Sequence, residues 1–256
     1  MKNIGLVSIS FRKLTIEEIF ELCSSNGLEN IEWGSDVHCK PKDTEAINKI
    51  NSLSEKYGIK TCAYGSYYRV GAENAGNADF KDIADTAKAL NAPVIRVWAF
   101  NKGSAEVTSQ EYEAVVADMR RICGIADAYG IKISLECHNN TLTDDYNSAL
   151  KLLSDANCEN LTMYWQPNQF KTLEYNFESA KALAPYVTNV HTFNWDKNLR
   201  FPLSDAIETW KKYADIIAVS KAHEHNYLLE FMPHDSPEEM SAECAALKKI
   251  FEELEL

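Results

Sequence analysis

The stretch TSQEYEAVVADMRRICGIADAYGIKISLE, residues 108–136, contains the pattern that decides the fold. Its first part, 108–129, has the length and apolar spacing of an amphipathic helix. Gly130 follows at the point where a helix C-terminus favours a left-handed residue. The run IKISLE, 131–136, then has the β-branched composition of a strand and ends on Glu136. A helix that leads directly into a short apolar strand is typical of α/β folds.

The same alternation of strand and helix occurs eight times along the chain. Strands are predicted at 4–8, 28–33, 59–64, 93–98, 131–136, 161–166, 187–193 and 227–231. Helices are predicted from Thr15, at 43–57, 78–91 and 108–129, from Thr143, at 175–184 and 204–224, and from Ser236. No linker or change in composition interrupts the series, which predicts one α/β domain, a single (β/α)8 TIM barrel over 1–256. A doubly wound open sheet is the alternative, but SISFRKLT after the first strand lacks its glycine-rich phosphate turn.

The composition and charge exclude several classes of protein. The chain has 256 residues, 45% of them hydrophobic, and a formal net charge of −12. This negative charge opposes binding to nucleic acid, which needs clustered Lys and Arg. The N-terminus lacks a signal-peptide pattern, and we expect no membrane span. The seven cysteines are scattered without a CxxC pair, which favours reduced thiols and a cytoplasmic protein.

Four polar side chains close late strands of the predicted barrel: Glu136, Gln166, His191 and Glu230. The carboxyl ends of barrel strands meet at one mouth, so we expect these four side chains to converge. Two carboxylates, an imidazole and an amide oxygen suit Mn²⁺, Mg²⁺, Co²⁺ or Zn²⁺. Each residue also has a simpler interpretation. The glutamates can form salt bridges at the rim, His191 can be a hydrogen-bonding residue there, and Gln166 can contact substrate without touching a metal.

Aromatic residues recur at the predicted carboxyl ends of the strands. They are Trp33, Tyr64, Trp98, Trp165 and Trp195. Flat rings at a barrel mouth suit a carbohydrate, because the apolar faces of a sugar stack on indole, although core packing explains any one of them. Further polar side chains are expected at the same end, where exposure to solvent is the default for each: Glu32, His138, Gln169, Lys197 and Arg200.

Six segments resemble the xylose isomerase-like TIM-barrel superfamily, the sugar isomerase/epimerase group that also includes endonuclease IV-type enzymes. They are IEWGSD (31–36), IRVWAF (95–100), SLECHNN (134–140), WQPNQ (165–169), VHTFNWDK (190–197) and LLEF (228–231). The resemblance covers essentially the whole chain and implies one divalent metal ion. The implied metal ligands are Glu136, Gln166, His191 and Glu230.

The resemblance also implies substrate contacts at His138 and Lys197, and it shows one departure from the family pattern. The usual Asp-x-x-His of strand six reads Gln166-Pro167-Asn168-Gln169 here, so a charge and a hydrogen-bonding group are lost. We expect a weaker or altered metal preference as a result. With only six His in the chain, the trinuclear zinc site of the endonuclease branch is excluded.

We therefore expect an isomerase or epimerase of carbohydrate metabolism that moves a proton next to a carbonyl through an enediolate. Glu136 and Glu230 would act from either side of the substrate carbon, with Trp33, Tyr64, Trp98, His138, Gln169 and Lys197 around the substrate. The alternatives are a lyase, such as an inosose dehydratase or a C-glycoside-cleaving enzyme, and a non-catalytic sugar-binding barrel. The identity of the substrate, whether it is phosphorylated, and whether the protein forms a homo-oligomer all stay open.

Overall fold

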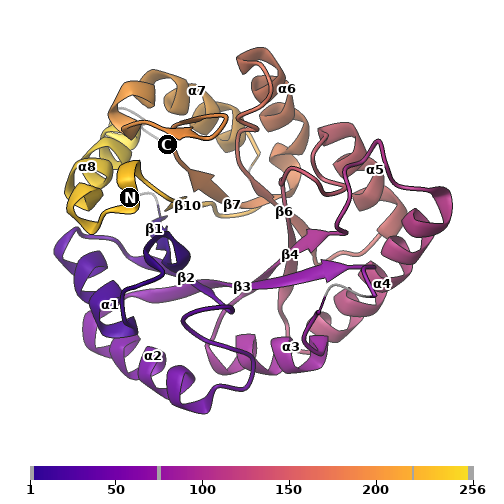
Figure 1. The fold of residues 1–256 in the computed structure, drawn as a ribbon, viewed down its shortest axis with the longest axis horizontal. Coiled ribbons are helices and arrows are strands. Elements are labelled where there is room, and N and C mark those ends of the chain that lie inside the picture. The colour runs from indigo at the N-terminus through magenta and orange to yellow at the C-terminus, as the bar shows by residue number, and fades with distance from the viewer. Residues whose placement is uncertain (1–2, 74–75, 221, 253–256) are drawn as a thin grey trace.

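The computed structural model describes residues 3–73, 76–220 and 222–252 and confirms the predicted barrel. Eight parallel strands close in the order β1-β10-β7-β6-β5-β4-β3-β2. The chain runs once around the ring, as the colour sequence in Figure 1 shows. The strands are β1 (Asn3–Val7), β2 (Asn30–Gly34), β3 (Lys60–Val70), β4 (Val94–Ala99), β5 (Lys132–Glu136), β6 (Leu161–Trp165), β7 (Val187–Thr192) and β10 (Asn226–Leu229).

The α-helices form an outer layer around these strands (Figure 1). They are α1 (Ile16–Ser25), α2 (Thr44–Tyr57), α3 (Phe80–Ala89), α4 (Ser109–Asp127), α5 (Tyr146–Ala156), α6 (Leu173–Leu183), α7 (Ile207–Ala218) and α8 (Met240–Phe251). Short 3-10 turns lie at η1 (Ser8–Phe11), η2 (Ala184–Tyr186), η3 (Leu203–Ala206), η4 (Pro233–Asp235) and η5 (Pro237–Glu239). Thr15 and Glu18 form the predicted capping box of α1, which satisfies backbone donors at the helix start.

Two apolar regions follow from the alternation of side chains along the strands. One face of each strand packs against the helices and forms the large outer core. The opposite face points into the barrel, where Val7, Ile9, Cys62, Ala63, Val94, Tyr164 and Leu228 fill the centre. The interior is therefore packed rather than open, and charged residues gather at its carboxyl end. All seven cysteines are free.

The structure departs from the predicted elements in two places. The third strand ends at Val70 rather than at residue 64, because TCAYGSYYRV continues extended past an irregular register between Gly65 and Arg69. A two-stranded hairpin, β8 (Trp195–Asp196) with β9 (Leu199–Arg200), lies between β7 and α7 where a loop was expected. Among the described residues, none of the helices is long and apolar enough to cross a membrane.

Candidate metal centre and active site

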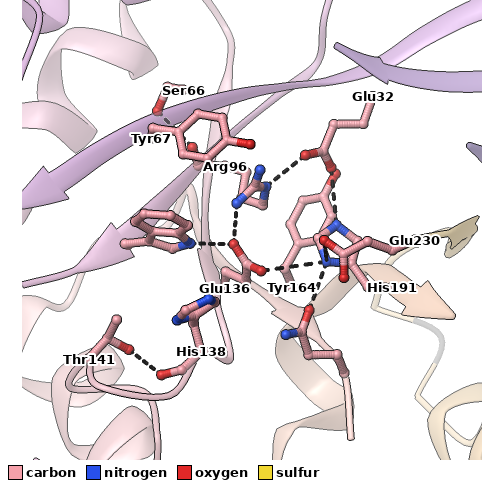
Figure 2. Close-up of polar contacts among 12 residues, drawn as sticks. Glu32, Ser66, Tyr67, Arg96, Glu136, His138, Thr141, Tyr164, His191 and Glu230 are labelled. Carbon is pink, nitrogen blue, oxygen red and sulfur yellow. Dashed lines mark hydrogen bonds and ion pairs between the residues drawn. The ribbon is translucent and has the colours of Figure 1, made fainter. Parts of the chain in front are cut away.

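Four side chains meet at the carboxyl end of the barrel, and we call Glu136, Gln166, His191 and Glu230 the mouth cluster (Figure 2 labels all but Gln166). Glu136 is the last residue of β5, His191 lies in β7, and Gln166 and Glu230 directly follow β6 and β10. Each faces inward because it is an even number of residues from an interior position of its own strand. All four residues are buried.

The ring nitrogen Nδ1 of His191 is the centre of the mouth cluster. It lies 2.7 Å from Oε1 of Gln166, 3.4 Å from Oε1 of Glu230 and 3.6 Å from Oε1 of Glu136. The ligand atoms of Glu136, His191 and Glu230 all lie within 4.8 Å of one another. Four potential ligand atoms from four strands thus surround one small space.

The other ring nitrogen of His191 faces deeper into the barrel. Nε2 lies 3.3 Å from Oε2 of Glu32, a fully buried residue of β2 (Figure 2). When His191 is neutral, as a bound cation would require, this contact favours the ring proton on Nε2 and leaves the lone pair of Nδ1 directed at the mouth cluster. A carboxylate that orients a histidine in this way is typical of metal sites in proteins.

Arg96 of β4 connects Glu32 with Glu136. Its Nε donates to Oε1 of Glu32 at 2.7 Å, and its Nη1 donates to Oε2 of Glu136, which also accepts from Nε1 of Trp98. Gly65 leaves room for this arrangement, because a Cβ there would lie 2.6 Å from Glu32 and 2.7 Å from Arg96. Oε2 of Glu136 is therefore fully engaged, while Oε1 still faces the mouth cluster.

The pKa values follow from this network. Burial raises the pKa of Glu32, but the charges of Arg96 and His191 outweigh burial and lower it to about 2. Burial also raises the pKa of Glu136, but the neighbouring cations, chiefly Arg96, outweigh burial and lower this pKa well below its usual range. Burial and the neighbouring charges of Glu136 and Glu32 raise the pKa of Glu230, although His191 and Arg96 act in the opposite direction. Burial lowers the pKa of His191, but Glu230, Glu136 and Glu32 outweigh it and raise the value to about 10.

The donor set fits a divalent cation. Three oxygens and one nitrogen are the ligand types that Mn²⁺, Mg²⁺, Co²⁺ and Zn²⁺ accept. With His191 neutral, the buried carboxylates of Glu32, Glu136 and Glu230 carry three negative charges against the single positive charge of Arg96. A divalent ion would balance the remaining two and would take the place of the proton that His191 otherwise binds.

The structure corrects the expectation that Trp33 and Tyr64 line the mouth. Both are fully buried between the sheet and the helices, where Trp33 packs on Phe20 and the Tyr64 hydroxyl donates to the backbone oxygen of Cys39. Trp165 likewise packs against Trp210 on the helix side. These rings follow inward-facing residues by one position, so they point the opposite way.

Other predicted residues do reach the mouth. A cavity of about 90 Å³ is lined by residues that include His138, Gln169 and Trp195 together with Glu136, Gln166 and Glu230. Trp98 borders it through ring contact with His138 at 4.9 Å. Lys197 lies exposed at the turn of the β8–β9 hairpin, and its backbone N–H donates to the carbonyl of Gln169.

Glu136 and Glu230, the two predicted catalytic carboxylates, lie close together and differ in their surroundings. They are close enough to share one ion, and Glu136 is held by Arg96 and Trp98, whereas Oε2 of Glu230 has no partner among the described residues. Sequence reasoning also missed Arg96 and expected Glu32 at an exposed rim. Charged residues inside apolar strands, in NIEWG and VIRVWA, were the available signal.

Two larger hollows lie away from this chemistry. One of about 570 Å³ lies between the starts of α4 and α5, and one of about 700 Å³ lies at the amino end of the barrel near β3 and β10. Neither contains a residue of the mouth cluster. The candidate site is therefore identified by the buried charged side chains that meet at the mouth, rather than by the size of its cavity.

A model of the xylose isomerase-like TIM barrel family matches residues 20–250. The chain belongs to this family. It is 26% identical to a 3-dehydroshikimate dehydratase of Bacillus anthracis, a match that covers 95% of both chains.

Solved structures of the same fold include the probable 3-DHS dehydratase AsbF from Bacillus anthracis, with a TM-score of 0.80 at 23% identity over 97% of this chain and 99% of that one. The IOLI protein, solved with a bound zinc atom, has a TM-score of 0.78 at 16% identity over the whole of both chains. L-ribulose 3-epimerase has a TM-score of 0.74 at 14% identity, over 98% of this chain and 95% of that one.

Proposed function

We propose that this protein is a divalent-metal-dependent lyase that removes water from a small hydroxy-carbonyl compound. The metal ligands in this proposal are Glu136, Gln166, His191 and Oε1 of Glu230, which surround one point at the mouth. A bound divalent ion would supply Lewis-acid stabilisation of negative charge on the substrate carbonyl oxygen. The likeness to a dehydratase over nearly the full length of both chains supports elimination rather than isomerisation.

The observation that carries the proposal is the difference between Glu136 and Glu230. Arg96 and Trp98 hold Glu136 as an ionised, immobile carboxylate, so it is poorly suited to exchange a proton. Glu230 keeps Oε2 free of partners among the described residues, at the edge of the cavity. It is therefore the carboxyl group that can exchange a proton with a bound ligand.

His138 supplies a second proton-transfer group at the same cavity. Its Nδ1 lies 2.7 Å from the backbone oxygen of Asn139, which fixes the ring proton there and leaves the lone pair on Nε2. In the proposed reaction, Nε2 of His138 takes the proton from the carbon next to the carbonyl. Glu230, which would carry a proton on Oε2 when substrate is bound while Oε1 faces the ion, gives that proton to the departing hydroxyl. The C–H and C–O bonds break, a C=C bond forms, and water leaves.

An isomerase or epimerase is the second candidate, and the fold shared with L-ribulose 3-epimerase is the observation in its favour. The same two residues would then return a proton to the substrate instead of assisting loss of hydroxide. Epimerisation needs return to the opposite face of the same carbon, and isomerisation needs return to the neighbouring carbon.

A reaction in D₂O, followed by NMR, separates the two. Metal-loaded protein is incubated with 3-dehydroshikimate and, separately, with unphosphorylated ketoses. A lyase gives a product with one water less, whereas an isomerase or epimerase gives an isomer that carries deuterium at the reacting carbon. Isomers alone would replace the lyase proposal with the second candidate, and no turnover of either class would contradict both.

Substitutions then test the roles of the two residues. We expect Glu230→Gln and His138→Gln each to lower kcat roughly 10²- to 10⁴-fold, the usual contribution of a positioned acid or base. His223→Gln is the matched control, because His223 lies beside Lys132 at the start of β5, at the other end of the strand from Glu136. An equal kcat for Glu230→Gln and wild type would contradict the assignment.

A further inference from the structure

The arginines near the barrel mouth differ in their partners. Arg96 pairs with two buried glutamates, Arg12 pairs with Asp36 at 2.6 Å, and Arg200 pairs with Asp235. Arg69 has no carboxylate within ion-pair distance in residues 3–73, 76–220 and 222–252. Its pKa is lowered by burial, with no neighbouring anion to offset that effect. A half-buried guanidinium without a counter-charge is costly to the protein alone.

The extension of β3 places Arg69 over the site. β3 has 11 residues, and Figure 1 shows it as a long arrow that continues past the neighbouring strands. Tyr67 has a left-handed backbone (φ 56°), within the interval where the register with β4 shifts. Beyond it, Arg69 is paired in register with Trp98, so the two side chains project from the same face of the sheet.

Trp98 connects Arg69 with the mouth cluster. The guanidinium carbon of Arg69 lies 4.3 Å from the centre of the Trp98 ring, and Nε1 of that ring donates to Glu136. His138 contacts the same ring system at 4.9 Å. Trp98 therefore contacts both the unpaired guanidinium and His138, one of the two proposed proton-transfer groups.

The guanidinium of Arg69 lies over the Trp98 ring, and its N–H groups lie in its own plane. This planar fork matches the two oxygens of a carboxylate. We propose that Arg69 binds a carboxylate of the substrate, so that the substrate class is a hydroxy-carbonyl acid whose reacting end reaches the mouth cluster. The single charge of Arg69 matches one negative charge, which favours a carboxylate over a phosphate dianion. This inference rests on the proposed function, since it names the substrate of that site.

Binding of matched probes to the metal-loaded protein tests it without turnover. 3,4-Dihydroxybenzoate and catechol share the metal-chelating diol and differ in the carboxylate, and 3,4-dihydroxyphenylphosphonate replaces the carboxylate with a phosphorus oxyanion. Isothermal titration calorimetry gives each Kd for wild type, Arg69→Gln and Arg69→Lys. Arg12→Gln is the control, because it removes the same charge from an arginine that already has a partner.

We expect wild type to bind the benzoate roughly 10- to 100-fold more tightly than catechol, the value of a charged hydrogen bond. Arg69→Gln should lose that preference and leave the Kd for catechol unchanged, Arg69→Lys should keep part of it, and Arg12→Gln should keep it. Equal weakening of benzoate and catechol in Arg69→Gln would show that Arg69 only supports Trp98, and stronger binding of the phosphonate would overturn the carboxylate assignment. Absence of lyase activity with the benzoate preference intact would contradict the proposed function and leave this inference standing.

Discussion

The two ends of the barrel interior are built from the same strands, but their buried polar groups have different kinds of partners. At the amino end, β2, β7 and β10 place Asn30, Asn189 and Asn226 inward, and the amide of Asn226 donates to Asn189 at 2.7 Å. Two residues further along β2 and β7, the inward residues are Glu32 and His191.

These inward asparagines are neutral and bond to one another and to the hydroxyl of Tyr164, whereas the carboxyl end is charged and leaves ligand atoms directed at a shared space. Neutral amides that satisfy one another stabilise the barrel, but they offer little to a ligand. Buried carboxylates that share one arginine are costly unless a further cation or ligand completes them. Polar side chains occur at both ends of the barrel. Incomplete charge compensation, rather than polarity alone, therefore distinguishes the candidate site.

The largest effect is expected from removal of the shared cation. Arg96→Met leaves Glu32 and Glu136 buried without their counter-charge, and we expect the free energy of unfolding to fall by about 3–5 kcal/mol. Urea denaturation measures this loss. Arg121→Met is the control, because Arg121 pairs with Asp118 at the surface and should cost less than about 1 kcal/mol. Similar losses of unfolding free energy for the two variants would contradict the view that Arg96 compensates buried charge at the carboxyl end.

A smaller effect is expected where the backbone makes room for the charges. In Gly65→Ala the new methyl group would lie 2.6 Å from Oε1 of Glu32, so the pair with Arg96 must shift. We expect a loss of about 1–3 kcal/mol in the free energy of unfolding, together with weaker metal binding. Gly124→Ala in α4 is the matched control, because no atom lies within 4 Å of its added carbon and Ala favours a helix by about 0.5–1 kcal/mol. A Gly65→Ala protein as stable as wild type would show that the pair has room to move.

A buried carboxyl group that lies at neither end of the barrel is expected to make the stability of the protein depend on pH. Burial raises the pKa of Glu243 on α8 to about 7, although the N–H of Leu203 donates to it at 3.1 Å. Because the folded-state value lies above the unfolded value, the contribution of Glu243 is fully present below about pH 4.5 and is lost as pH rises through about 7. We expect wild type to lose about 3 kcal/mol across this window and Glu243→Gln to lose less. Identical pH profiles in chemical denaturation would assign the dependence to other groups.

The smallest effect is expected at the amino end. Asn226→Ala removes one neutral hydrogen bond to Asn189, and we expect the free energy of unfolding to fall by about 1 kcal/mol. Metal affinity, measured by competition with a chelating dye, should not change, because this pair lies beyond the packed centre of the barrel. A clear loss of metal affinity would mean that the two ends are coupled.

The barrel was predictable from sequence because its signal repeats eight times and each copy supports the others. The convergence of Glu136, His191 and Glu230 was predictable for a related reason, since strand ends of a closed parallel sheet meet. The facing of Trp33 was misjudged, although alternation supplied the rule: if Glu32 points inward, the next residue points outward.

The pairing of Arg96 with Glu32 and Glu136 could not be inferred in the same way. It depends on which inward side chains of β2, β4 and β5 lie at the same height in the closed barrel, and on the space that Gly65 leaves. Strand register and the end of β3 are properties of the closed sheet as a whole, and no local pattern contains them.

The uncharged amide at position 166 has a consequence for the kind of molecule that can approach. Once a doubly charged ion is seated, the buried groups beneath the entrance sum to electrical neutrality, so an acidic guest meets no repulsive field from below. An aspartate there would leave one excess negative charge under the entrance. A neutral amide in place of a carboxylate at the barrel mouth thus makes the entrance tolerant of anions.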